Sequence, residues 1–177
     1  VLLFIVAICT FPIIWTSSSI LEDKRTEAVV LVLMSLSGFM LMTSSDHYMM
    51  LFIGLEIGSI SLYALAGLNR NDSYSNEAAL KYFLFGSFAS AILVYGIALM
   101  YTAVSASGFY ETSLSIAYIG EPNVPLTAIV GLALFTFGLL FKVSAAPFHA
   151  WAPDVYQGAP TAYVGYMAAV VKTASFV

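Results

Sequence analysis

Apolar residues occur in long uninterrupted blocks along the chain, and short clusters of polar and charged residues separate these blocks. The blocks are too long for β-strands and show no alternation with a period of two, so they predict helices and exclude a sheet. We therefore expect an all-α protein with about six transmembrane helices. The polar clusters place these helices at 1–21, 28–45, 48–68, 78–104, 126–147 and from 161 onward.

Composition agrees with a membrane location for these helices. Hydrophobic residues make up 60% of the chain, charged residues 9%, and the mean hydropathy is +0.92. A soluble domain carries about 25% charged residues. So few charges cannot cover a water-facing surface, and most of the blocks approach the roughly 20 residues that cross a bilayer. We conclude that this is an integral membrane protein, and we expect lipid as its surroundings.

The sequence offers little chemistry for a bound cofactor. Its single cysteine, Cys9, lies inside an apolar block, which excludes a disulfide framework and a cysteine metal site. No GxGxxG or P-loop spacing occurs either. The net charge of −4 is spread over too few residues to indicate a partner, and nothing suggests nucleic acid. We expect no cofactor and no metal in this chain.

The two ends of the chain lead to further expectations. Residues 1–21 are too long for the apolar core of a signal peptide and lack a basic flank, so we interpret them as a spanning helix. The last block, 161–177, is only 17 residues long, which is short for a spanning helix. We expect a fragment, or one piece of a split protein, that ends inside the membrane. We divide it into a first helix with its loop, 1–27, and a remaining unit, 28–177.

Basic residues in the loops predict the orientation. The loops after the first and third helices hold Lys24, Arg25 and Arg70, whereas the loops after the second and fourth helices hold no lysine or arginine. Basic loops stay on the cytoplasmic side of a membrane, or the matrix side in mitochondria. In the second basic loop, Ser75 is the expected N-cap of the next helix. The segments expected together on that side are 22–27, 69–77 and 147–160.

Four ionisable residues fall inside the predicted helices. A charge at the centre of a bilayer costs roughly 2.5–3.5 kcal/mol on insertion scales, so each needs a partner, water or a function. Their positions make them the candidate functional residues of the chain: Glu56, Lys81, Lys142 and Lys172.

Glu56 lies near the middle of the third predicted helix. Gly54 and Gly58 flank it at the GxxxG spacing that lets another helix approach closely. The carboxylate either only joins helices or exchanges protons in a polar interior, and we favour the second interpretation.

Two of the lysines each have two interpretations. Lys81 lies one to two turns from the start of its helix, where it can extend to the interface with Glu77 as a local partner. The third and fourth helices are antiparallel neighbours, so Lys81 can instead pair with Glu56. Lys172 lies about 16 Å deep in the sixth helix at 1.5 Å per residue. It either pairs with another chain or carries protons.

Lys142 ends an apolar run shortly before Pro147. Proline cannot donate a hydrogen bond to the carbonyl of Val143, and its ring displaces that carbonyl. In a bilayer such a carbonyl needs water or a polar side chain, so we expect a broken helix beside a hydrated path. His149 and then Asp154 follow, which makes His149 a candidate proton relay. The alternatives are that Pro147 only kinks the helix and that the two later residues are ordinary interface residues.

Three stretches closely resemble one family: GLEIGSISLYALAGL (54–68), EAALKYFLFGSFAS (77–90) and FKVSAAPFHAWAPDVYQGAPT (141–161). They are similar to the antiporter-like subunits of proton-pumping NADH:quinone oxidoreductase, respiratory complex I, and most of all to the subunit 2 branch. The resemblance implies two inverted repeats of five helices, each with a broken helix and a buried lysine. Residues 28–177 would then form the first repeat, apparently incomplete, with the second repeat absent.

The resemblance also implies a function. The chain would move protons for NADH:ubiquinone reductase without redox chemistry of its own, while NADH, FMN, iron–sulfur clusters and quinone bind partner subunits. Its partners would be other membrane-arm subunits and a chain that completes the second repeat. We expect the mitochondrial inner membrane, with a bacterial plasma membrane as the alternative. A subunit of a multi-chain sodium/proton antiporter is the alternative function. The implied proton-carrying residues are Glu56, Lys81, Lys142 and Lys172, with His149 at a position that is usually histidine.

Overall fold

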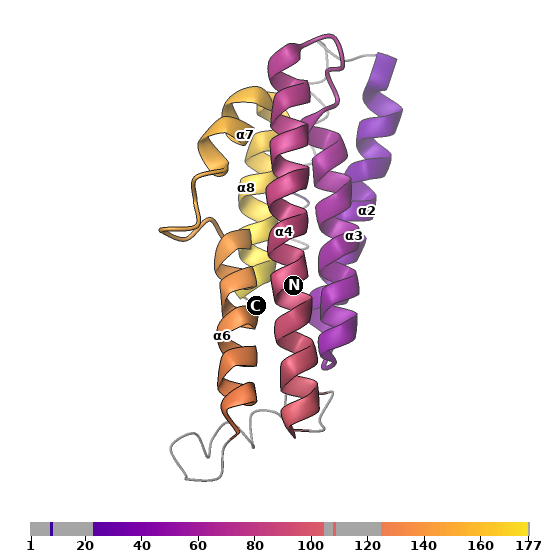
Figure 1. Ribbon diagram of the computed structural model, residues 1–177. Helices are drawn as coiled ribbons and strands as arrows, with labels where there is room; N and C mark the ends of the chain where they lie inside the picture. The colour runs from indigo at the N-terminus through magenta and orange to yellow at the C-terminus, as the bar shows by residue number, and fades with distance from the viewer. Residues whose placement is uncertain (1–7, 9–22, 105–107, 109–124, 177) are drawn as a thin grey trace.

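The computed structural model describes residues 8, 23–104, 108 and 125–176 (Figure 1). Over these ranges the chain is helical, apart from turns and one isolated β-bridge between His47 and Gly108. The all-α prediction is confirmed, while the first predicted helix falls almost entirely outside the described residues. The helices are α2 (Arg25–Ser44), α3 (Tyr48–Ala66), α4 (Ser73–Val104), α6 (Leu126–Lys142), α7 (Ala152–Gly158) and α8 (Thr161–Phe176).

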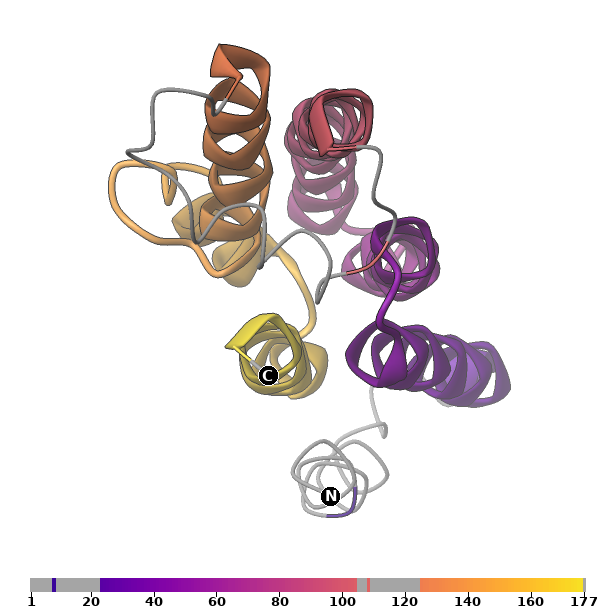
Figure 2. The same cartoon turned by 90° about the horizontal axis from the view of Figure 1, so that it is seen from below.

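The helices form a bundle in which α2, α3, α4 and α6 run in alternating directions along the chain (Figure 1). Helices α2, α3 and α4 follow one another along one side, and α6 and α8 lie on the other side when the bundle is viewed along its axis (Figure 2). The most extensive packing joins α4 to α6 and α2 to α3. Helices α2, α3 and α4 are long and apolar enough to cross a membrane, and α6 is a shorter apolar helix of 17 residues. The chain is a multi-pass membrane protein.

The fourth helix begins earlier than predicted. Its first residue is Ser73, and the Asp72 side chain accepts a hydrogen bond from the backbone N–H of Tyr74 at 3.0 Å. Ser75, the predicted N-cap, instead donates its hydroxyl to the carbonyl of Ala66 at the end of α3, at 2.7 Å. The N-cap prediction was therefore wrong, because an aspartate three residues earlier takes that role.

The start of α2, the α3–α4 loop and α7, which belong to the three segments expected on one side of the membrane, lie toward one end of the bundle, while the connection before α7 lies nearer its middle (Figure 1). Lys24, just before α2, donates to the carbonyl of Leu68 in the α3–α4 loop at 2.7 Å. Gly158 of α7 lies against the backbone of Tyr74 in the first turn of α4. The shared end is thus confirmed, and the compartment that it faces stays a prediction.

Glycines set the distance between α2 and α3. A Cβ atom added at Gly54 would lie 2.6 Å from the backbone nitrogen of Met42 and 2.7 Å from the carbonyl oxygen of Gly38. At Gly58 it would lie 2.6 Å from the Phe39 ring. The predicted close approach is confirmed. Because residues two positions apart point about 200° apart around a helix, this packing turns Glu56 away from α2.

The break in the fifth predicted helix is present, but it begins before the proline. Helix α6 ends at Lys142, the chain is non-helical through Pro147, and a helix resumes only at Ala152. In Figure 1 the connection loops away from the bundle before it turns into α7. Pro147 therefore lies inside the connection, where it contributes no kink to α6.

A left-handed residue ends α6. Ser144 has a φ of 58°, the conformation that commonly follows the last turn of a helix. The backbone N–H of Ser144 donates to the carbonyl of Phe141 at 3.0 Å, and that of Ala145 donates to the carbonyl of Leu140 at 2.9 Å. This pattern is a Schellman motif, and it satisfies carbonyl groups that the helix end would otherwise leave without a donor.

Candidate functional site

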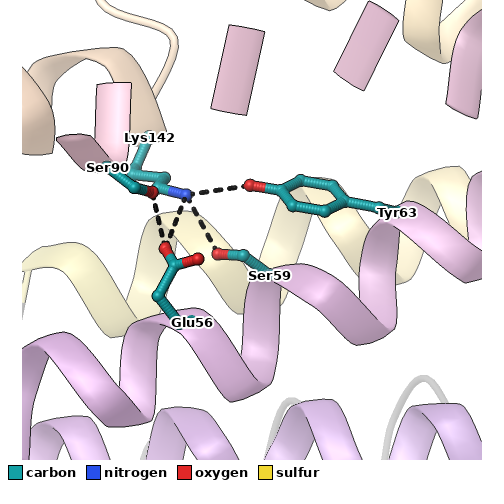
Figure 3. Close-up of polar contacts among 5 residues, drawn as sticks. All are labelled: Glu56, Ser59, Tyr63, Ser90 and Lys142. Carbon is teal, nitrogen blue, oxygen red and sulfur yellow. Dashed lines mark hydrogen bonds and ion pairs between the residues drawn. The ribbon is translucent and has the colours of Figure 1, made fainter. Parts of the chain in front are cut away.

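Lys142 is the last residue of α6, and its side chain is buried between helices. The residue is 4% exposed. Its ammonium donates to the hydroxyl of Ser59 at 3.0 Å and to the phenol oxygen of Tyr63 at 3.2 Å. The carboxylate oxygen Oε1 of Glu56 lies 3.8 Å from Nζ (Figure 3). The sequence predicted a buried lysine at this break, and the structure surrounds it with three polar groups.

All three groups come from one face of α3. Glu56, Ser59 and Tyr63 follow the i, i+3, i+7 spacing, which stacks side chains along a single face of a helix. That face lies roughly opposite the glycines that contact α2. One helix therefore supplies both the acid and the hydroxyl groups, while α6 supplies the base.

A third helix contributes a hydroxyl group to this cluster, which so far consists of Lys142, Glu56, Ser59 and Tyr63. Ser90 of α4 donates its hydroxyl to Oε1 of Glu56 at 2.5 Å, the short end of the range for a hydroxyl bonded to a carboxylate (Figure 3). The Glu56 side chain is 23% exposed and that of Lys142 is 3% exposed, so the acid is nearer to solvent or lipid than the base.

Aromatic side chains enclose the lysine on one side. The Tyr63 ring centre lies 5.7 Å from the ammonium and packs edge-on against Tyr82 at 4.7 Å. Trp151 stacks on Tyr82 at 4.8 Å and donates its indole N–H to the carbonyl of Phe141 at 3.3 Å. The segment after the break thus folds back over the end of α6 and excludes water from that side.

Lys81 is paired with two carboxylates outside this cluster. Its ammonium lies 2.7 Å from Glu77, its local partner one turn earlier, and 2.6 Å from Asp154 of α7. These side chains are between 35% and 58% exposed. The pairing of Lys81 with Glu56 that we considered is therefore not what the structure shows. Lys81 lies near the start of α4 and points to α7, whereas Glu56 lies at the middle of α3.

The remaining two candidates are also outside the cluster. His149 is exposed in the turns between α6 and α7, because the helix that would have carried it alongside Lys142 has already ended. Lys172 is half-buried in α8, and within the described ranges no hydrogen bond or ion pair of its side chain is found. Of the five predicted proton-carrying residues, only Glu56 and Lys142 come together.

Sequence reasoning missed three members of the cluster: Ser59, Tyr63 and Ser90. The signal for Ser59 and Tyr63 was their spacing from Glu56, which places them on its face. Ser90 had no signal of this kind, because its contact depends on how α3 and α4 pack. Across the described residues there is also no group of three or more His, Cys, Asp or Glu that could hold a metal ion.

A profile of the NADH:quinone oxidoreductase/Mrp antiporter transmembrane family matches residues 45–177, a range that contains the whole cluster. The chain belongs to this family. The resemblance drawn from the three sequence stretches is confirmed.

Named relatives and solved structures agree with the family. NADH-quinone oxidoreductase subunit N 1 of Chloroherpeton thalassium is 48% identical over 156 residues, which cover 88% of this chain and 32% of the relative. Subunit N of Magnetococcus marinus is 41% identical over 177 residues, which cover 99% of this chain and 36% of the relative. The chain therefore spans about a third of the length of these relatives.

Two solved membrane complexes contain the same fold. Respiratory complex I from Thermus thermophilus with bound aureothin has a chain with a TM-score of 0.78 and 35% identity, covering 99% of this chain and 38% of that one. The membrane-bound sulfane sulfur reductase, an archaeal respiratory membrane complex, gives a TM-score of 0.82 and 28% identity, covering 98% of this chain and 35% of that one.

Proposed function

We propose that the chain is part of a proton-translocating membrane subunit of an NADH:quinone oxidoreductase. The observation that carries the proposal is the buried ammonium of Lys142, held by two hydroxyl groups and facing a carboxylate across 3.8 Å. A buried ionisable pair in a membrane is costly, and such pairs occur where protons or ions move. The family match, with relatives named subunit N, supports the assignment.

The proton step rests on the two opposed influences that act on Lys142. Burial disfavours its charged form, whereas the carboxylate of Glu56 favours it. A movement of Glu56 toward or away from the ammonium would therefore make Lys142 take up or release a proton. Lys81, Lys172 and His149 would carry the proton to and from this pair, as the family resemblance implies. Redox cofactors and the quinone would bind other subunits.

The membrane is a further part of the proposal. The subunit N relatives described above are bacterial, which favours a bacterial plasma membrane over the mitochondrial inner membrane that we expected first. The partners would be other membrane-arm subunits and the segment that supplies the second repeat.

Two substitutions at Lys142 test the proposal. Lys142→Met removes the proton carrier, and Lys142→Arg keeps the charge but cannot release the proton. We expect both variants to assemble and both to lower the rate of proton pumping by at least about 100-fold, the scale of a lost acid–base group. Pumping is measured as acidification driven by NADH in sealed membrane vesicles. Undiminished pumping in either variant would contradict the assigned role.

The alternative function is a subunit of a multi-chain sodium/proton antiporter. The family description includes the Mrp antiporter, so the match to residues 45–177 is compatible with both the oxidoreductase and the antiporter. A native gel of gently solubilised membranes separates the two. Comigration of the chain with NADH-oxidising activity in a large band supports the oxidoreductase, whereas a smaller assembly without that activity supports the antiporter.

A further inference from the structure

The Glu56–Lys142 pair is in contact range but is not hydrogen-bonded. Oε1 of Glu56 accepts from Ser90 at 2.5 Å and lies 3.8 Å from Nζ of Lys142. A direct charge-assisted N–H···O bond would be about 2.7–2.9 Å long. The same carboxylate oxygen thus faces a neutral donor from α4 and a cationic donor from α6, and it bonds to the neutral one (Figure 3).

The lysine side of the pair is arranged in a matching way. An ammonium has three N–H donors. Lys142 directs two of them to the neutral oxygens of Ser59 and Tyr63. Hydroxyl groups accept from an ammonium and can also donate to a neutral amine, so these two partners suit both states of the lysine. The carboxylate favours the charged state.

Ser90 has one hydroxyl hydrogen, and it donates the hydrogen bond of that group to Glu56. In the structure that bond and the open ion pair occur together. If it breaks, Oε1 needs to move only about 1 Å to bond directly with the ammonium, given the usual length of such bonds.

We propose that Ser90 is a positioning residue that holds Glu56 out of direct hydrogen bonding with Lys142 and so keeps the ion pair open. Opening and closing of the pair then depends on the Ser90–Glu56 bond, a contact between α3 and α4. This inference rests on the proposed function, because an open pair matters for pumping only if Lys142 carries protons.

The test is Ser90→Ala in the assembled membrane complex that contains this chain, with Ser90→Thr as the variant that restores the hydroxyl. In a cryo-electron microscopy structure of the alanine variant we expect the Nζ–Oε1 distance to fall from 3.8 Å to about 2.8 Å. We expect the pumping rate to fall about tenfold, equivalent to about 1.4 kcal/mol. Ser90→Thr should restore both the Nζ–Oε1 distance and the pumping rate.

Ser61→Ala is the matched control. Ser61 lies on the same helix as Glu56 and donates to the carbonyl of Ile57 at 2.9 Å, within its own helix. Its loss should change neither the distance nor pumping. Ser90→Ala in a Glu56→Gln background should add no further loss, because the carboxylate that Ser90 holds is gone.

Two results would overturn the inference. One is a distance that stays near 3.8 Å in the alanine variant, and the other is a defect that threonine does not correct. Both differ from failure of the proposed function, which is read from Lys142→Met, since the distance is measured independently of pumping. If the alanine variant does not assemble, Ser90→Cys, which keeps a weak donor of similar size, takes its place for the same measurements.

Discussion

Lys142 is stabilised by oxygen atoms of three kinds: a serine hydroxyl, a phenol and a carboxylate. Removing a lysine ammonium from water costs several kcal/mol even after the protein relaxes. A hydrogen bond to a charged group returns about 1.5–3 kcal/mol. Two such bonds and one open ion pair are therefore of the same size as the cost, which is the condition for a group that changes its charge easily.

Tyr63→Phe should show how much one of these bonds contributes. The change removes the phenol oxygen and keeps the ring that packs on Tyr82. Loss of about 1–2 kcal/mol corresponds to a change of roughly 5- to 30-fold in an equilibrium, and we expect pumping to fall within that range while assembly is unaffected. NADH-driven acidification in vesicles measures it. Tyr95→Phe, at an exposed tyrosine of α4, is the control, and equal pumping in the two variants would contradict the role of the phenol.

At this scale the sequence revealed the charges but not their surroundings. Glu56 and Lys142 could be found from the sequence alone, because a charge inside an apolar helix carries a large free-energy cost. The sequence did not single out Ser59, Tyr63 and Ser90. Residues with hydroxyl groups are common in such helices and matter only where they face a charge. The possible pairing of Lys81 with Glu56 was argued from the depth of Lys81 along its helix, and depth does not show which way a side chain points.

At the scale of elements, the break after α6 depends on backbone conformation more than on proline. Pro147 made the break predictable, but the helix ends earlier because Ser144 adopts a left-handed conformation and its neighbours cap the last carbonyls. A non-glycine residue in that conformation has no signature in the sequence. The prediction was therefore right about the existence of the break and late in its position.

Substitutions at Ser144 should change stability in opposite directions. The left-handed conformation costs a non-glycine residue about 1–2 kcal/mol, so Ser144→Gly should stabilise the protein by up to about 1 kcal/mol. Ser144→Val, with a branched Cβ, should destabilise it by a similar amount. The midpoint of thermal unfolding of the purified complex measures both. A valine variant as stable as the glycine variant would show that another conformation is tolerated here.

On the scale of the whole molecule, contacts distant in sequence join one end of the bundle. Lys24 bonds to the α3–α4 loop, and Lys81 of α4 bonds to Asp154 of α7. The pattern of basic loops predicted that these segments share a side, because charge placement follows membrane topology. It could not predict the specific pairs, since those depend on the path of the chain after the helix break.

Asp154→Asn tests whether the Lys81 pair is structural or part of the proton path. Both side chains are substantially exposed, so water and salt screen the pair and its contribution to stability is small. We expect a slight loss of thermal stability that disappears at high salt, with pumping close to that of the unchanged protein. Glu77→Gln, which removes the other partner, should behave alike. A large pumping loss in either variant would show that proton transfer through Lys81 also needs that carboxylate partner.

The end of α6 at Lys142 has an electrostatic consequence of its own. The peptide dipoles of a helix add up to about half a negative elementary charge at its C-terminus. In a helix that crosses the whole bilayer, this negative pole would lie in water and be screened. Because α6 stops within the bundle, its pole lies at a buried residue, Lys142, and not in water. The interrupted backbone thus places a fixed negative partial charge inside the bundle, which substitution of side chains in the cluster would leave in place.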